Sequence, residues 1–536
     1  MKSYLLPTLA VCLAWTDLQA AAMAATAAPA TNTVAAPYIL TPPAPAKPRI
    51  NGANVFGVRP GSPVLYTIPA TGDRPMTYSA KKLPDGLKLD EKTGQITGTL
   101  KEKGEFTVTL RAKNARGADE KKLRIVAGDQ LALTPPMGWN SWNCFAQAVT
   151  EDRVKSAADA MVKSGLINHG WTYINVDDFW QNHRDSRDQT LRGEFRDTNG
   201  FIVPNSRFPD MKGMADYIHA LGLKAGLYSS PGPWTCGGCA ASFGYELQDA
   251  ETYAKWGFDY LKYDWCSYSP TMENQRGTTN YPLSARNVVY APANTQLEKL
   301  EQPYKLMGKL LRDQKRDIVF SLCQYGQGNV WQWGGSVDGS CWRITGDIQD
   351  TWRSMSGNGF NKDKTAPYSK PGNWNDPDML VVGQVGWGRT HPSRLTPDEQ
   401  YTHISLWCLL ASPLLIGCDM TKLDDFTLNL LENDEVLAID QDELGRQATT
   451  VITDGDLRVY EKELADGGRA VGFFNLGAQP LKIDFKDFAK LSLTQKQTVR
   501  DLWRQKDVAK INPAKDSLPL EIPTHGVLLY KLTAAK

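Results

Sequence analysis

The feature that most constrains the fold is a regular alternation of short apolar segments with longer segments of helical pattern, which begins at Leu131 and continues for about 310 residues. Such an alternation predicts βα units and a parallel sheet. Eight strands are expected: Met137–Asn143, Tyr173–Asp178, Lys224–Ser229, Tyr260–Trp265, Ile318–Cys323, Trp342–Asp347, Trp374–Leu380 and Pro413–Cys418. Eight such units predict a (β/α)8 barrel, and the alternative, a doubly wound sheet, lacks its Gly-rich fingerprint at the first strand.

The two ends of the chain have a different pattern, so the protein is expected to have several domains. Short alternating segments separated by Gly, Asp and Asn turns predict a small β-sandwich over residues 49–128, before the barrel at 129–446. Similar segments predict an antiparallel β-sandwich domain over residues 447–536. Residues 25–48 are rich in Ala and Pro with almost no charge, which is typical of an extended linker.

Residues 1–24 have the pattern of a secretory signal peptide: a charged start, a short apolar run and small residues at the cleavage region. No later run of about 18 apolar residues predicts a membrane anchor, so we expect an exported protein, periplasmic or extracellular. Loss of Cys12 with the signal would leave eight cysteines in an oxidising compartment, where disulfides form. Cys236 and Cys239 have the spacing of a zinc knuckle, but no second pair or His pattern supports that alternative.

Charge excludes some partners. The chain has 60 Lys and Arg against 59 Asp and Glu, a formal charge of +1, which favours neither nucleic acid nor an anionic membrane as partner. A small or neutral ligand is therefore expected. The 16 Trp, 20 Tyr and 16 Phe residues supply flat apolar surfaces that either fill cores or stack on carbohydrate rings.

Polar residues gather at the carboxyl ends of the predicted strands, where a barrel carries its active site. Four of the eight ends bring carboxylates, and they include Asp177, Asp178, Asp264, Asp347 and Asp378. A single aspartate there is usually a helix cap, but several at one mouth need a counter-charge, a metal or a substrate. Three chemistries fit: metal-assisted hydrolysis, enolase-type proton abstraction and glycoside cleavage by a carboxylate pair. None of the six histidines falls at a predicted strand end, which disfavours zinc, whereas magnesium stays open.

Seven segments at successive strand ends carry a family resemblance. They are TPPMGWNSWN (134–143), YINVDDFW (173–180), KAGLYSSPG (224–232), FDYLKYDWC (258–266), WRITGDIQDTW (342–352), WNDPDML (374–380) and LLASPLLIGCDM (409–420). As an ordered set they resemble the family 27 glycoside hydrolases, the melibiase-type α-galactosidases, from Thr134 to Gln447. Residues 83–100 resemble the immunoglobulin-like modules of exported bacterial proteins. The resemblance implies a retaining exo-glycosidase that releases terminal α-linked galactose and needs no cofactor or metal.

The resemblance also implies roles for individual residues. Asp264 matches the nucleophile and Asp347 the acid/base. The positions that match sugar-binding residues are Trp142, Asp177, Asp178, Tyr228, Lys262, Arg343, Asp378 and Met379. The family pairs the cysteine after the nucleophile with one after the third strand, which implies Cys266 with Cys236, or with Cys239 as the alternative. A second disulfide is expected between Cys323 and Cys341.

The chain departs from the family at the end of the fifth strand. Many members have Cys-Glu-Trp there, with the acidic residue facing the second hydroxyl of the sugar, whereas this chain has Cys323-Gln324-Tyr325-Gly326. Gln324 is expected to keep the hydrogen bond without the charge. Cleavage of β-L-arabinopyranosides or α-N-acetylgalactosaminides therefore stays open, and so does a silent carbohydrate-binding protein. Residues 272–295 form an expected insertion on the aglycone side, and Lys262 is expected to hold Asp264 ionised from the same strand face.

Overall fold

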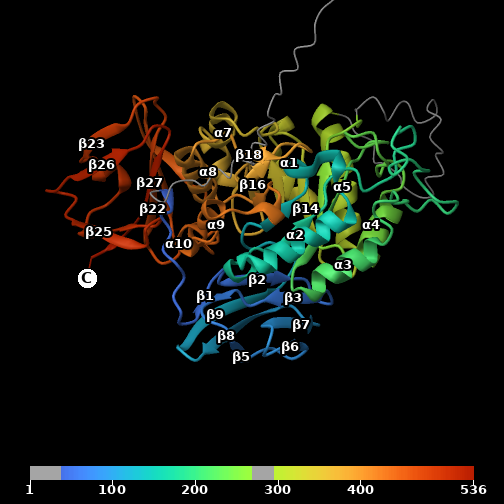
Figure 1. Ribbon diagram of the computed structural model, residues 1–536, viewed down its shortest axis with the longest axis horizontal. Helices are drawn as coiled ribbons and strands as arrows, with labels where there is room; N and C mark the ends of the chain where they lie inside the picture. Colours follow the sequence, from blue (N-terminus) through green and yellow to red (C-terminus); the bar gives the residue numbers. More distant parts are fainter. Residues whose placement is uncertain (1–37, 269–294, 536) are drawn as a thin grey trace, which may run out of the picture. The chain divides into compact units, whose positions relative to one another are not determined.

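The computed structural model describes residues 38–268 and 295–535 (Figure 1). The predicted signal peptide, the first part of the predicted linker and nearly all of the expected insertion at 272–295 lie outside these residues. Within the described ranges, every helix is too short or too polar to cross a membrane.

The central domain is the predicted (β/α)8 barrel. Its eight strands pair in parallel in the order β16-β15-β14-β13-β12-β11-β10-β19. A parallel bridge between Leu380 and Ile416 links the two ends of this sheet and closes the barrel. The strands are β10 (Met137–Asn140), β11 (Tyr173–Asn175), β12 (Lys224–Ser229), β13 (Tyr260–Asp264), β14 (Val319–Cys323), β15 (Cys341–Arg343), β16 (Trp374–Asp376) and β19 (Leu414–Ile416). All eight predicted strands are present.

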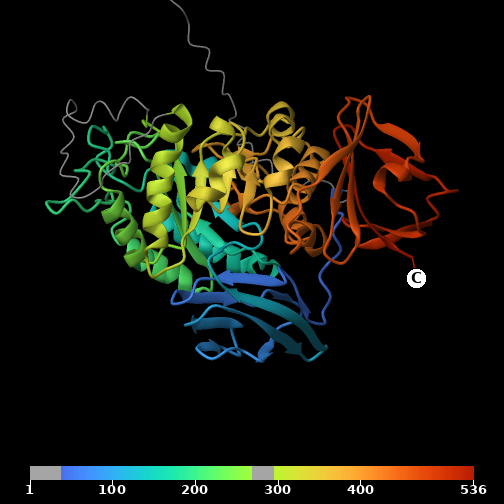
Figure 2. The ribbon, with the colours of Figure 1, turned by 180° about the vertical axis from the view of Figure 1, so that it is seen from behind.

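Helices alternate with these strands and surround them (Figures 1 and 2). They are α1 (Trp142–Phe145), α2 (Glu151–Lys163), α3 (Met211–Ala220), α4 (Glu246–Trp256), α5 (Gln296–Arg312), α6 (Val330–Trp333), α7 (Trp352–Gly359), α8 (Pro397–Leu409), α9 (Asp425–Leu431) and α10 (Asp434–Asp440). Capping residues in the sequence determine where several of these helices begin. Thr150 caps α2 by accepting a hydrogen bond from the Arg153 amide, and Thr396 forms a capping box with Glu399 at the start of α8.

Several barrel strands are shorter than predicted, and the difference positions the site. The ladder of β11 ends at Asn175, so Asp177 and Asp178 lie beyond it. Likewise β15 ends at Arg343, four residues before Asp347. These aspartates therefore lie on loops at the carboxyl ends of the strands, where backbone pairing no longer dictates which way a side chain points.

The N-terminal module is β-rich, as predicted. One sheet has the order β2-β9-β8-β5, a second β3-β7-β6, and β1 pairs with β4. The strands are β1 (Arg49–Ile50), β2 (Val55–Val58), β3 (Pro63–Thr67), β4 (Ala70–Thr71), β5 (Thr77–Lys81), β6 (Leu87–Leu89), β7 (Gln95–Thr99), β8 (Gly104–Asn114) and β9 (Gly117–Ala127). Alternate residues of β8, including Val108, Leu110 and Ala112, enter a core of their own.

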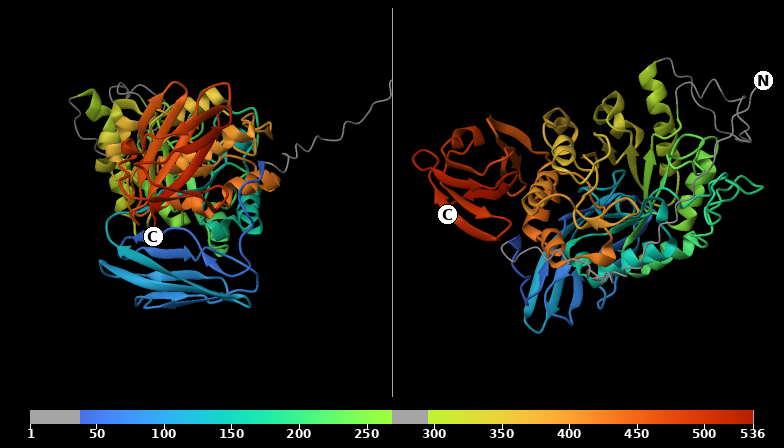
Figure 3. Two further views of the ribbon diagram at one scale, coloured as in Figure 1. Left: turned by 90° about the vertical axis from the view of Figure 1, so that its left-hand side faces the viewer. Right: turned by 45° about the horizontal axis from the view of Figure 1, so that its top comes forward.

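The C-terminal domain is built from antiparallel strands, in red in Figure 3, whereas β2 and β9 of the N-terminal module pair in parallel. A six-stranded sheet has the order β20-β21-β22-β27-β24-β25, and β23 pairs with β26. The strands are β20 (Thr449–Asp454), β21 (Leu457–Glu463), β22 (Arg469–Asn475), β23 (Leu481–Phe485), β24 (Gln497–Asp501), β25 (Lys506–Ile511), β26 (Leu518–Ile522) and β27 (Val527–Ala534). Val459, Phe473 and Leu520 contribute to its separate hydrophobic core.

The end of the predicted linker makes specific contacts. The Leu40 and Thr41 amides both donate to Oδ1 of Asn429 on α9, at 3.1 and 3.0 Å. The Thr41 hydroxyl donates to the Asn429 carbonyl, and the Asn429 amide donates back to the Thr41 carbonyl at 2.8 Å. These residues are therefore fixed on the barrel rather than free in solution.

Two short β-hairpin strands complete the barrel loops. β17 (Gln384–Val385) pairs antiparallel with β18 (His391–Pro392). The loop between them carries Trp387, whose backbone has a φ of 49° and whose amide donates to the Asn143 carbonyl. This hairpin brings an aromatic residue to the carboxyl ends of the barrel strands.

Candidate active site

A cavity at the carboxyl ends of the barrel strands brings the predicted residues together. Its lining is Trp142, Asn143, Asp177, Asp178, Tyr228, Cys236, Lys262, Asp264, Tyr325, Arg343, Asp347, Ile348, Asp378, Met379 and Trp387. Both predicted catalytic carboxylates and eight of the nine predicted sugar-binding residues are among them. Gln324 is the exception. Asn143, Tyr325, Ile348 and Trp387 were not expected from the sequence.

Asp264, at the end of β13, is 5% exposed and accepts three hydrogen bonds. Its Oδ1 accepts from the Tyr325 hydroxyl at 2.6 Å and from the Trp265 amide at 2.7 Å. Its Oδ2 accepts from the Tyr228 hydroxyl at 3.1 Å. These donors stabilise a buried carboxylate and fix its orientation.

Lys262 lies two residues before Asp264 on the same strand, but its ammonium bonds to Asp177 at 2.8 Å. Asp177 also accepts from the Asn140 amide at 2.9 Å. Burial opposes the Lys262 charge, yet attraction to Asp177, and to Asp264 as well, raises the pKa of the ammonium. Lys262 therefore bonds directly to Asp177, while it acts on Asp264 only through the field of its charge.

Asp178 lies in a different environment from its neighbour Asp177. Its carboxylate accepts from the Gly237 and Phe179 amides, both at 2.8 Å. Burial nevertheless raises the pKa of Asp178 to about 7, and the charge of Asp177 adds to this effect. The two adjacent aspartates both line the cavity because β11 has already ended.

Asp347 and Asp378 share a cation. The Arg343 guanidinium, with a side chain 3% exposed, contacts Asp347 at 2.9 Å and Asp378 at 3.0 Å. Asp378 also accepts from the Ile348 amide at 2.8 Å. Burial raises the pKa of Asp378, although Arg343 opposes the shift. The Asp347 side chain is 64% exposed, in contrast to the buried Asp264.

Asp177, Asp264 and Asp378, the carboxylates that could hold magnesium by residue type, already have partners. Lys262 bonds to Asp177, Arg343 contacts Asp378, and three donors hold Asp264. Among the described residues, one cluster has metal-ligand types at short range, Asp264 with Cys236 and Cys266, and its two sulfurs are bonded to each other. The donor set therefore suits a polar neutral ligand better than a cation.

Gln324 is fully buried, and neither its side-chain oxygen nor its nitrogen has a partner among the described residues. It follows Cys323, the last residue of β14, and is not among the residues that line the cavity. Tyr325, one residue further on, lines the cavity instead. A contact between Gln324 and the sugar stays a prediction.

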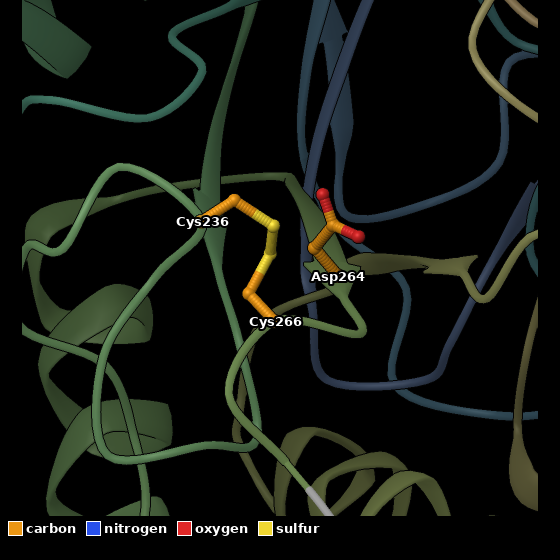
Figure 4. A group of neighbouring side chains, drawn as sticks. All are labelled: Cys236, Asp264 and Cys266. Carbon is orange, nitrogen blue, oxygen red and sulfur yellow. A yellow bond between two sulfur atoms is a disulfide. The ribbon is translucent and has the colours of Figure 1, made fainter.

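One of the two expected disulfides is present, and the prediction of the other is wrong. Cys236 and Cys266 are bonded, and Figure 4 shows their sulfurs beside Asp264. Cys323 and Cys341 are both buried free thiols. The register explains the error, because Cys341 pairs with Ser321 and Cys323 lies two residues, about 6–7 Å, further along its strand. Added at right angles to the spacing of about 4.8 Å between neighbouring strands, this offset puts the two Cα atoms about 8 Å apart, which is too far for a disulfide.

Trp142 has its ring stacked on Phe179, with centroids 6.3 Å apart and planes inclined by 9°. It forms an aromatic wall of the cavity together with Trp387. Trp387 is carried by the β17–β18 hairpin at a positive φ, a placement that no strand pattern in the sequence signals. Apolar ring faces beside several carboxylates and hydroxyls are typical of sites that bind sugars.

Comparison with known proteins agrees with this arrangement. The family model for alpha galactosidase A matches residues 134–293 and 288–442, and the model for the alpha galactosidase C-terminal beta sandwich domain matches 454–532. An Ig domain model matches residues 23–126. The three models correspond to the barrel, the C-terminal domain and the N-terminal module.

The alignments with individual relatives cover most of the length of each relative. Alpha-galactosidase 2 of Arabidopsis thaliana is 38% identical over 437 residues, 80% of this chain and 97% of the relative. A Bacteroides fragilis crystal structure, provisionally described as an alpha-galactosidase/melibiase, is 37% identical with a TM-score of 0.80 and covers 91% of this chain and 98% of its own.

A more distant structure is the family 27 β-L-arabinopyranosidase of Geobacillus stearothermophilus, solved with arabinose. It is 27% identical, has a TM-score of 0.61, and covers 76% of this chain and 98% of its own. Since the first family model alone spans more than half of the sequence, the chain belongs to the alpha galactosidase A, or melibiase, family and is a glycoside hydrolase.

Proposed function

We propose that this protein hydrolyses terminal α-linked D-galactose from oligosaccharides or polysaccharides with retention of configuration. The observation that carries the proposal is that one cavity is lined by a buried, hydrogen-bonded Asp264 and a largely exposed Asp347. A retaining glycosidase needs two carboxylates in different environments, one ionised as the nucleophile and one able to exchange a proton with solvent. Hydroxyl-binding groups such as Asp177, Lys262 and Asp178 surround them.

In the first step, a lone pair of Asp264 forms a bond to the anomeric carbon while the glycosidic bond breaks. Asp347 gives its proton to the departing oxygen, which leaves as an alcohol. In the second step, Asp347 takes a proton from water, whose oxygen attacks the anomeric carbon and displaces Asp264. Two inversions give net retention, and both aspartates return to their starting protonation.

The surrounding groups position the sugar in this proposal. The Lys262–Asp177 pair and the Arg343–Asp378 pair present charged hydrogen-bonding groups to sugar hydroxyls, and Trp142 covers an apolar ring face. Export to an oxidising compartment is part of the proposal, because the Cys236–Cys266 disulfide requires one.

The test is hydrolysis of three p-nitrophenyl glycosides: the α-galactoside, the β-L-arabinopyranoside and the α-N-acetylgalactosaminide. We expect the highest kcat/KM with the α-galactoside, and NMR should show α-galactose as the first product. Asp264→Asn should lower kcat by more than about a thousandfold. Asp216→Asn is a matched control, because Asp216 is an exposed residue of α3 that pairs with Lys212.

Each contrary outcome has a definite meaning. Preference for one of the other two sugars would assign a different substrate to the same chemistry. Release of β-galactose first would refute retention. No hydrolysis of any of the three, with galactose still bound, would identify a carbohydrate-binding protein instead of an enzyme.

A further inference from the structure

Tyr325 stands at the position where the resemblance leads one to expect tryptophan. It has a hydroxyl group, which an indole ring lacks, and this hydroxyl contacts Asp264. Its hydroxyl donates to Oδ1 of Asp264 at 2.6 Å, the shortest of the three hydrogen bonds to that carboxylate. Burial raises the pKa of the Tyr325 phenol, and the negative charge of Asp264 adds to this effect. The phenol therefore keeps its proton and acts as a donor.

The backbone holds Tyr325 in an unfavourable conformation to make this contact. Its φ is 57° and that of Gly326 is 78°, and the Gln327 amide donates to the Gln324 carbonyl to close the turn. Two successive positive φ values are those of a type I′ turn, which favours Gly, Asn and Asp over an aromatic residue. Strain of this kind is typically retained at functional sites.

The hydrogen bonds to Asp264 are distributed unequally between its two carboxylate oxygens. Each carboxylate oxygen has about two lone-pair sites. Oδ1 uses both, for the Tyr325 hydroxyl and the Trp265 amide, whereas Oδ2 accepts one longer bond from Tyr228. Among the described residues, one lone pair of Oδ2 is therefore left without a donor.

We propose that Tyr325 is a positioning residue that saturates Oδ1 of Asp264 and so presents Oδ2 as the attacking oxygen. This inference rests on the proposed role of Asp264. In the first step the free lone pair of Oδ2 forms the bond to the anomeric carbon, and the electrons of the glycosidic bond pass to the leaving oxygen, which takes the proton of Asp347. When the ester later breaks, Tyr325 stabilises the carboxylate that re-forms.

Tyr325→Phe isolates the hydroxyl. The variant keeps the ring, and with it the packing under the Arg343 guanidinium, which lies 5.5 Å from the ring centroid. Tyr304→Phe is the matched control. Tyr304 lies on α5, its ring stacks on Trp265 at 5.8 Å, and its buried hydroxyl has no hydrogen-bond partner among the described residues.

We expect Tyr325→Phe to lower kcat and kcat/KM on aryl α-galactosides by about 10- to 100-fold, the effect of losing a hydrogen bond to a charged group. Inhibition by galactose should change by less than about twofold, because Tyr325 acts through Asp264 and not on binding. The fall in kcat/KM caused by Tyr325→Phe should be equal for substrates with good and with poor leaving groups. The fall caused by Asp347→Asn should be smaller for substrates with good leaving groups. Tyr304→Phe should behave as the unaltered enzyme.

Asp264→Asn, assayed in parallel, separates the two proposals. If Asp264→Asn keeps its activity, the proposed function fails, and the role of Tyr325 fails with it. If Asp264→Asn is inactive while Tyr325→Phe matches Tyr304→Phe, the inference on Tyr325 alone is overturned. A crystal structure of the glycosyl-enzyme should show the ester on the oxygen that Tyr325 does not contact, and an ester on the other oxygen would also overturn the inference.

Discussion

Removal of the Cys236–Cys266 disulfide should weaken both the fold and the activity. The bond closes a loop of 30 residues. Closing a loop of this length lowers the entropy of the unfolded chain, which stabilises the fold by about 3.6 kcal/mol at 25 °C. The same bond ties the residue two positions after Asp264 to Cys236, which lines the cavity (Figure 4). Its loss should therefore release the segment that fixes the predicted nucleophile.

The perturbation is the double variant Cys236→Ala and Cys266→Ala, which leaves neither partner of the disulfide as a new free thiol. Thermal unfolding should begin several degrees lower, in line with a loss of about 3–4 kcal/mol. Well below this transition, kcat should still fall, because the carboxylate is held less firmly. Wild-type protein treated with a phosphine reductant should behave like the variant.

Cys408→Ala is the control, because Cys408 is a buried free thiol on α8 that takes no part in a disulfide. It measures the cost of losing a buried sulfur without loss of a cross-link. An unfolding temperature and kcat equal to those of Cys408→Ala would refute the reasoning. The same conclusion would follow if reduction of the wild type changed neither quantity.

Two further perturbations test the charges of the cavity. Lys262→Met should lower the free energy of unfolding by about 3–5 kcal/mol, because it leaves Asp177 buried without its cation. Lys212→Met, which removes an exposed ion pair, should cost about 0–1 kcal/mol, and equal losses in denaturant titrations would contradict the argument. Asp178→Asn should gain stability over the wild type as the pH rises from about 4 to about 7. Over that range the folded wild type still binds the Asp178 proton, because its pKa is raised, whereas the unfolded chain has lost it, so wild-type stability falls as protons become scarcer. A stability difference between Asp178→Asn and the wild type that does not change with pH would contradict this argument. The same variant should also bind galactose more weakly.

The order of strands and helices could be predicted from the sequence because each βα unit carries its own local pattern. Apolar runs marked all eight barrel strands, and Thr150 caps α2 through a hydrogen bond from a residue only three positions away. The alternation of side chains also placed Lys262 and Asp264 on one face of β13. These features depend on neighbours in sequence, so the sequence alone determined them.

Contacts between strands depended on register, which no local pattern carries. The pairing of Cys341 with Ser321 placed Cys323 out of reach of a disulfide. The Lys262 ammonium bonds to Asp177, which follows β11, instead of to Asp264 on its own strand, β13. The early end of β11 also allowed Asp177 and Asp178 to face one cavity. Only the closed barrel fixes these relations.

Tyr325 and Trp387 depended on backbone conformation. Both residues have a positive φ, which turns a loop side chain in a direction that strand alternation does not predict. The sequence determined which chemical groups the mouth of the barrel contains. The tertiary structure decided which of them touch, because loop geometry and sheet register set distances between residues far apart in the chain.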